Sequence, residues 1–169
     1  MMTLSTVTPL RTIFAGTPEF ACPSLQALLD HAGCEVVAVY TQPDRRAGRG
    51  QKLRISAVKQ LALDNQLEIR QPQNFKSADA LTEFAALKAD LFVVAAYGLI
   101  LPQALIDMSR FTLNVHASLL TRWRGTAPIQ RARMAGEEQT GISIMSLGKP
   151  LDAGQDWFTH PGPTHCAIH

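Results

Sequence analysis

Two polar residues, Asn114 and His116, occupy alternate positions near the end of a short apolar segment, residues 112–116. In an extended strand, alternate side chains leave the same face. An amide can donate a hydrogen bond to an oxygen that becomes negative in a tetrahedral intermediate. An imidazole titrates near neutral pH, so it can stabilise that charge or move a proton. The pair therefore suits acyl transfer to a substrate that brings its own amine.

A simpler interpretation of the same spacing is a buried polar pair that backbone groups satisfy. The sequence around the pair bears on this choice. Directly after it comes a basic aromatic loop, Arg122-Trp123-Arg124-Gly125, and a carboxylate that could hold the imidazolium and order a water is available further on, with Asp152 the best candidate.

The elements that must position these residues alternate between strand and helix patterns. A short buried-strand pattern ends at Gly16, a helix is expected to begin at Pro23, and a β-branched strand follows at Glu35–Thr41. Such a βαβ unit requires a right-handed crossover. Further strands are expected at residues 67–71, 91–96, 112–116 and 141–147, and further helices at 56–66, 77–89 and 127–135. The pattern predicts an α/β fold with a doubly wound, mostly parallel sheet, whose ligands bind at the carboxyl ends of the strands.

The glycine pattern argues against a dinucleotide or P-loop site. The first strand-to-helix turn has the single glycine Gly16, and neither GxGxxG nor GxxxxGK[ST] occurs in the chain. The backbone cradle for a diphosphate is therefore missing. The predicted fold is Rossmann-like without a dinucleotide fingerprint.

Basic residues are concentrated in one polar segment, Gln42–Leu53. Five of the 16 lysines and arginines fall between Arg45 and Arg54, and Gly48 and Gly50 flank Arg49. A solvated surface loop and a loop that embraces phosphates are equally good interpretations. Residues 97–102 form an apolar loop. It could be one wall of a pocket for a flat ring or a buried turn, and the sequence favours neither.

Composition indicates an intracellular globular protein. The chain is 46% hydrophobic and 18% charged, with a net charge of +2. Three cysteines without CxxC spacing, and no basic-then-apolar amino-terminal segment, favour a reducing, cytoplasmic location without a membrane anchor. The last residues, 156–169, include three histidines and a cysteine that could be metal ligands. The adjacent His165 and Cys166 suit one tetrahedral site poorly, so a frayed tail without metal is expected.

Several motifs together resemble one family. They are Ala15-Gly-Thr-Pro-Glu-Phe20, Thr41-Gln-Pro-Asp-Arg45 with Ala47-Gly-Arg-Gly50, Ala96-Tyr-Gly-Leu-Ile-Leu-Pro102, Asn114-Val-His116, Ser118–Arg131 and Leu151-Asp-Ala-Gly154. Jointly they resemble the methionyl-tRNA formyltransferases in register from Arg11 to Gly154. Those enzymes transfer a formyl group from 10-formyltetrahydrofolate to the methionine of initiator methionyl-tRNA.

The resemblance implies roles for particular residues. Asn114, His116 and Asp152 match the catalytic trio. Folate contacts are implied for two groups, Ser118, Leu119, Leu120 and Thr121, and Tyr97, Gly98 and Leu99. Contacts to the tRNA acceptor end are implied for Arg45, Arg46, Arg49 and Lys52. No metal is implied, and a monomer is expected.

The same resemblance sets the expected organisation of the chain. Residues 1–10 are an extension, 11–154 an incomplete formyltransferase domain and 155–169 an aberrant tail, with the family's carboxyl-terminal tRNA-binding domain absent. The resemblance departs most at Gly148-Lys-Pro-Leu151, where Pro150 stiffens the segment that delivers Asp152. We expect this chain alone to formylate poorly. The alternatives are a non-catalytic fragment that binds folate or RNA, and a formyltransferase for a sugar amine or glycinamide ribonucleotide.

Overall fold

The computed structural model describes residues 8–47, 50, 52–117, 139–147 and 156–163. The chain divides into two compact units, residues 1–111 and 112–169. Within the described residues, no helix is both long and apolar enough to cross a lipid bilayer.

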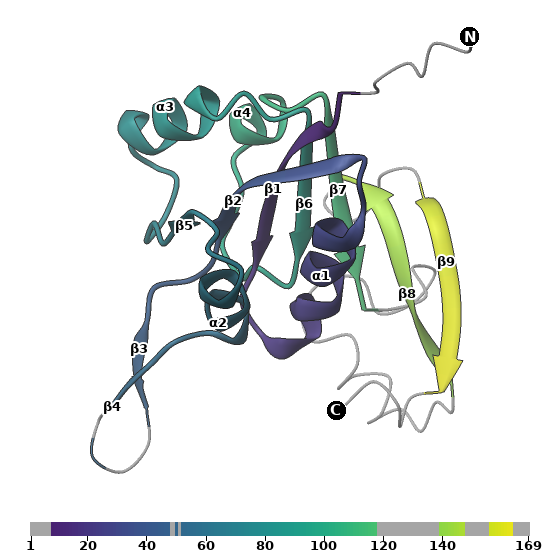
Figure 1. Ribbon diagram of the computed structural model, residues 1–169, viewed down its shortest axis with the longest axis horizontal. Coiled ribbons are helices and arrows are strands. Elements are labelled where there is room, and N and C mark those ends of the chain that lie inside the picture. The colour runs from purple at the N-terminus through teal and green to yellow at the C-terminus, as the bar shows by residue number, and fades with distance from the viewer. Residues whose placement is uncertain (1–7, 48–49, 51, 118–138, 148–155, 164–169) are drawn as a thin grey trace, which may run out of the picture. The chain divides into compact units, whose positions relative to one another are not determined.

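The first unit is built on a parallel sheet of four strands in the order β5-β2-β1-β6 (Figure 1). The strands are β1 (Leu10–Gly16), β2 (Cys34–Tyr40), β5 (Ile69–Arg70) and β6 (Leu91–Ala95). All three strand pairs are parallel. Every residue of β6 is buried, as its continuous apolar run predicts for a central parallel strand.

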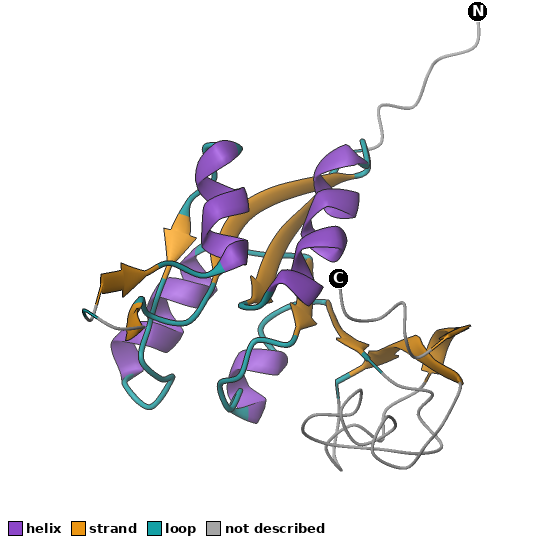
Figure 2. Ribbon diagram, turned by 90° about the horizontal axis from the view of Figure 1, so that it is seen from below, coloured by secondary structure: helices purple, strands orange, loops and turns teal. Residues whose placement is uncertain are grey.

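Helices cover both faces of this sheet (Figure 2). They are η1 (Glu19–Ala21), α1 (Cys22–Asp30), α2 (Ala57–Asp64), α3 (Ala78–Ala86) and α4 (Gln103–Ile106). The chain moves outward from β1 through β2 to β5 and then returns to β6. Because crossovers are right-handed, this reversal places α1 and α2 on one face and α3 on the other. The switch point between β1 and β6 marks the edge where ligands bind in such sheets.

Local signals in the sequence account for the helix boundaries. Pro23 lies in the first turn of α1, where its missing N–H costs nothing. The Ser56 and Ser77 hydroxyls accept hydrogen bonds from the Lys59 and Ala80 amides and cap α2 and α3. These two side-chain caps mark the starts of both helices.

The core of the first unit is an aromatic cluster between the sheet and α3. Phe84 packs edge-on against Phe92, with 5.0 Å between the ring centroids. Tyr40 lies 5.6 Å from Phe84 and 5.9 Å from Phe75. All four rings are almost completely buried, so they hold α3 on the sheet.

The basic segment, expected as a loop, contains a β-hairpin. Strand β3 (Arg45–Ala47) pairs antiparallel with β4 (Lys52–Arg54) and projects from the first unit (Figure 1). The expectation of an irregular loop is therefore wrong at these residues. Each strand has only three residues and no alternation of apolar side chains, so periodicity could not reveal it.

The second unit contains antiparallel strands. Strand β7 (Phe111–His116), which starts at the boundary residue, pairs with β8 (Gln139–Ser146), and β8 pairs with β9 (Asp156–Pro163). The predicted strands at 112–116 and 141–147 are confirmed, whereas the helix expected at 127–135 lies outside the described residues. The frayed tail is a wrong expectation at residues 156–163, where β9 pairs with β8 with one shift of register between Ile144 and Met145.

Prolines explain why β9 was missed. Pro161 lies opposite Gly141, and Pro163 lies opposite Gln139. Proline cannot donate to a ladder and is tolerated mainly at sheet edges, so two prolines argue against a strand in any sequence-based prediction. Taken with the parallel strands of the first unit, the chain has the predicted α/β class with a mostly parallel, doubly wound sheet.

Candidate active site

The carboxyl ends of β1 and β6 form one part of the candidate site, within the first unit. The chain leaves β6 through Ala96 and Gly98, which both have positive φ, +47° and +82°. The Tyr97 carbonyl between them accepts a hydrogen bond from Thr17 Oγ1 at 2.9 Å. This contact ties the loop after β6 to the residue that follows β1.

Close packing fixes the shape of this loop. A Cβ added to Gly98 would lie 2.2 Å from the Gln42 amide nitrogen, and one added to Gly16 would lie 2.9 Å from the Ala95 carbonyl. Gly16 is thus required for the close approach of β1 and β6, whereas a Cβ at Gly98 would displace the Gln42 side chain. Gly16, which matched no phosphate-binding fingerprint, has a packing role.

The structure separates the three residues of this loop that were predicted to bind folate. The Tyr97 side chain is buried and its ring is tilted against that of Phe75, with ring centroids 6.3 Å apart. Burial raises the pKa of its hydroxyl well above the usual range. Gly98 is exposed and Leu99 is half-buried. The Tyr97 side chain is therefore kept away from solvent. The side chain of Ile100, which follows Leu99, is 92% exposed and offers apolar surface.

The predicted catalytic pair lies on β7, in the second unit. Asn114 is half-buried and His116 is 7% exposed. The two residues alternate along a regular strand and so share one face, as predicted. The apolar strand keeps the imidazole in a surrounding where hydrogen bonds act more strongly than in water.

The neighbouring strand adds a residue that the sequence analysis did not identify. Ser143 of β8 lies directly opposite His116 and is fully buried, and Met145 lies opposite Asn114. Directly opposed residues of an antiparallel pair place their side chains on one face. Only the cross-strand register shows that Ser143 stands beside the imidazole; the nearest local signal was the alternation within residues 141–147.

The described part of the hairpin carries three of the four cations that were predicted to bind RNA, Arg45, Arg46 and Lys52. Arg45 lies opposite Arg54, Arg46 opposite Leu53 and Ala47 opposite Lys52. Arg54, which was not among the predicted RNA-binding residues, therefore lies beside them. All four cationic side chains are exposed, and like charges directly opposite one another destabilise a strand pair. The described part of the hairpin carries no carboxylate, so this arrangement favours an anionic partner.

Several predicted site residues lie outside the described residues. They are Asp152, Ser118, Leu119, Leu120, Thr121 and Arg49. Among the residues that the structure describes, no three histidine, cysteine or acidic side chains are grouped so as to hold a metal ion.

Comparison with known proteins places this geometry in context. A family model described as formyl transferase matches residues 10–159, past the glycine at which the resemblance was expected to stop. A methionyl-tRNA formyltransferase of Pseudomonas fluorescens (strain Pf0-1) is 60% identical over 147 residues, and one of Pseudoalteromonas translucida is 57% identical over 147 residues. Each alignment covers 86% of this chain and 46% of the relative, so the chain spans about half the length of these relatives.

Solved structures share the fold at low sequence identity. A phosphoribosylglycinamide formyltransferase from Anaplasma phagocytophilum matches with a TM-score of 0.74 and 16% identity, covering 95% of this chain and 78% of that one. A formyltetrahydrofolate deformylase from Pseudomonas syringae pv. tomato matches with a TM-score of 0.69 and 18% identity, covering 92% of this chain and 51% of that one. The family model covers most of the sequence, and this chain belongs to the formyl transferase family.

Proposed function

We propose that this chain carries the formyl-transfer site of a methionyl-tRNA formyltransferase. The reaction transfers the formyl group of 10-formyltetrahydrofolate to the α-amine of methionine on initiator methionyl-tRNA. The observation that carries the proposal is the pair Asn114 and His116 on one face of β7, in a member of the formyl transferase family whose relatives at about 60% identity bear that name.

The chemistry of the pair suits this reaction. The amine attacks the formyl carbon, a new C–N bond forms, and the bond from that carbon to the folate nitrogen breaks. Asn114 donates a hydrogen bond to the developing oxyanion, and His116 stabilises the same charge. Asp152 supports the transfer of the amine's proton to the departing folate nitrogen, so the proton that the amine loses ends on the leaving group.

The loop after β6 is proposed to line the pterin pocket. The backbone of Gly98 and Leu99 offers polar groups, and the exposed Ile100 side chain offers an apolar surface for a flat ring. Binding sites of this kind are mostly apolar with a few fixed polar groups. Residues 118–121 are proposed to complete the folate contacts.

The hairpin is proposed to bind the acceptor end of the tRNA. Its exposed cations, Arg45, Arg46, Lys52 and Arg54 together with Arg49, provide guanidinium and ammonium groups for phosphates. A monomeric state, a cytoplasmic location and a formyltransferase domain that begins at residue 11 belong to the same proposal. Two other functions, formylation of a sugar amine or of glycinamide ribonucleotide and binding of folate or RNA without catalysis, are the alternatives that an activity assay distinguishes.

The test is a formyl-transfer assay on this chain beside the full-length Pseudomonas fluorescens relative. Methionyl-tRNA, deacylated tRNA, glycinamide ribonucleotide and a sugar amine are offered as acceptors. We expect formylation of methionyl-tRNA alone, slow in the 169-residue chain. Substituting Asn114→Ala or His116→Ala, in this chain and at the matching positions of the relative, should lower the rate by about 10²–10³-fold.

The controls separate the alternatives. Ile142→Ala, at an exposed position of β8, should leave the rate unchanged. Formylation of a sugar amine or of glycinamide ribonucleotide in place of methionyl-tRNA would contradict the substrate assignment. Full activity of both His116→Ala proteins would contradict the site itself, and an inactive chain that still binds folate or RNA would identify a binding module.

A further inference from the structure

Gln42, directly after β2, contacts four segments of the first unit. Its backbone N–H donates to Thr17 Oγ1 at 3.3 Å, and its carbonyl accepts from Gln71 Nε2 at 3.0 Å. Its side-chain Nε2 donates to the Tyr97 carbonyl at 3.1 Å, and its Oε1 accepts from the Arg45 guanidinium at 2.6 Å. One amide thus bridges the loop after β6 and the hairpin.

The loop side of this bridge is tightly fitted. The Tyr97 carbonyl accepts both the Gln42 amide and the Thr17 hydroxyl. Gly98, at φ +82°, leaves no space for a Cβ beside Gln42 Nε2. The Gln42 side chain thus occupies the space beside Gly98, and its hydrogen bond to the Tyr97 carbonyl links its position to that of the loop.

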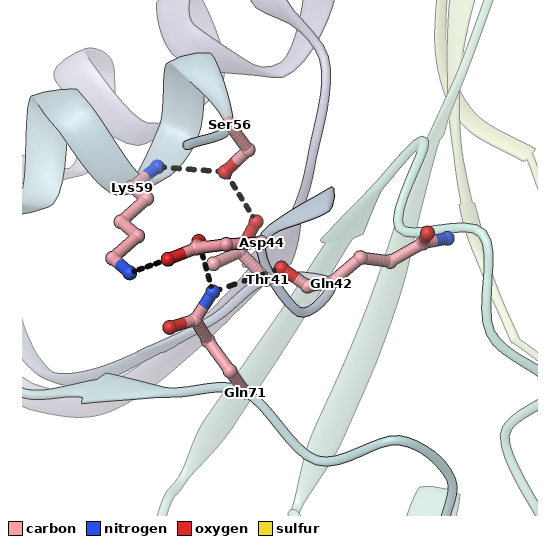
Figure 3. Close-up of polar contacts among 6 residues, drawn as sticks. All are labelled: Thr41, Gln42, Asp44, Ser56, Lys59 and Gln71. Carbon is pink, nitrogen blue, oxygen red and sulfur yellow. Dashed lines mark hydrogen bonds and ion pairs between the residues drawn. The ribbon is translucent and has the colours of Figure 1, made fainter. Parts of the chain in front are cut away.

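The hairpin side is anchored by a second set of contacts. Lys59 Nζ lies 2.5 Å from Asp44 Oδ2, and Gln71 Nε2 donates to Asp44 Oδ1 at 2.8 Å. Both members of the ion pair are mostly buried, at 16–17% side-chain exposure. Figure 3 shows the Gln42 side chain extending away from this pair. The base of the hairpin is thus fixed, and Gln42 forms a separate link from Arg45 to the loop.

We propose that Gln42 is a positioning residue that couples the RNA-binding hairpin to the folate-binding loop. The inference rests on the proposed function, which assigns these two ligands. RNA that orders Arg45 also orders the Gln42 amide, so folate then meets a loop whose entropy is already reduced. The converse holds equally, because coupling between two binding sites is reciprocal.

Two substitutions separate the hydrogen bond between Gln42 and Tyr97 from the one between Gln42 and Arg45. Gln42→Leu removes both side-chain hydrogen bonds. Gln42→Glu keeps the acceptor for Arg45 and removes the donor to Tyr97. Gln103→Leu is the matched control, because Gln103 makes an exposed side-chain hydrogen bond to Asp107, the residue after α4. Thermal unfolding checks that each variant folds.

Amide hydrogen exchange of the ligand-free chain tests the bridge. We expect Gln42→Leu to speed exchange at least about threefold in peptides from the hairpin and from residues 96–101. Gln42→Glu should do so only in residues 96–101, and Gln103→Leu in neither. Unchanged loop exchange in Gln42→Leu, or a hairpin equally loosened by both substitutions, would overturn the bridge.

Binding of an acceptor-stem RNA minihelix and of 5-formyltetrahydrofolate, each alone and together, tests the coupling. In the wild-type chain each ligand should tighten the other at least about threefold. This factor should fall to one in Gln42→Leu and persist in Gln103→Leu. Independent binding in the wild type would overturn the coupling while leaving the proposed function intact. Failure to bind either ligand would overturn the proposed function and the coupling with it, and the exchange experiment would still decide the bridge.

Discussion

At the scale of single residues, Gly98 combines a backbone conformation that favours glycine with a close neighbour. Its φ of +82° strains any other residue, and its Cβ position overlaps the Gln42 amide. We expect Gly98→Ala to lower the free energy of unfolding by about 1–3 kcal/mol, measured by urea denaturation.

Gly50 provides the matched control for that substitution. It has a φ of +103°, but a Cβ there would meet nothing within 4 Å. Gly50→Ala therefore reports the backbone strain alone, and the difference between the two substitutions reports the overlap with Gln42. Equal losses in both variants would show that Gln42 does not fill the space beside Gly98.

At the scale of elements, the hairpin shows a conflict between stability and charge. Arg45 and Arg54 face each other across β3 and β4. Replacing Arg54→Glu should stabilise the hairpin by about 0.2–1 kcal/mol, since opposite charges then lie across the ladder. The same substitution should weaken binding of an acceptor-stem RNA and flatten its dependence on salt.

Hydrogen exchange of the hairpin and filter binding at several salt concentrations measure the two effects. Arg54→Gln separates charge removal from charge reversal. RNA affinity that rises together with hairpin protection would show that the hairpin does not bind phosphates.

The base of the hairpin should respond to pH. Hydrogen bonds from Lys59 and Gln71 hold the pKa of the Asp44 carboxyl below its ordinary value. A lowered pKa stabilises the fold above the unfolded value, about 4, and this stabilisation is lost as the pH falls through the folded value. Asp44→Asn should therefore cost about 1 kcal/mol at neutral pH and progressively less below about pH 4.

Thermal unfolding of the wild type and of Asp44→Asn across this pH range measures the difference. Asp64→Asn, on the exposed side of α2, is the control. A gap in melting temperature that stays constant with pH would contradict the assigned ion pair.

The elements divide clearly into those that the sequence predicts and those that it does not. The buried run of β6 and the Ser56 cap of α2 depend on neighbouring residues, so periodicity and capping rules identify them. The shared face of Asn114 and His116 follows from alternation alone. Ser143 and Gln42 act across distant segments, and such register and packing are not encoded locally.

At the scale of the whole chain, two units carry separate fluorescent reporters. Both tyrosines, Tyr40 and Tyr97, lie in the first unit, and both tryptophans, Trp123 and Trp157, lie in residues 112–169. Phe84→Ala should lower the stability of the first unit by about 3–5 kcal/mol, because it empties the centre of the aromatic cluster.

Thermal unfolding, followed separately by tyrosine and by tryptophan fluorescence, measures this effect. The tyrosine-detected midpoint should fall, and a coincident fall at the tryptophans would show that the chain unfolds as one cooperative body. Phe111→Ala, at 41% exposure, should change either midpoint little. An unchanged tyrosine midpoint in Phe84→Ala would contradict the packing of α3.

Strand β9 has a consequence for the behaviour of the protein at high concentration. Among the strands that the structure describes, β9 pairs with β8 and with no other, so within this set it is an edge strand. Open edges invite pairing with a second chain and growth into aggregates. Pro161 and Pro163 remove two N–H donors from one end of this edge, so an incoming strand finds no continuous ladder there. Pro161 and Pro163, which argue against a strand in a sequence-based prediction, thus also make β9 a poor template for self-association.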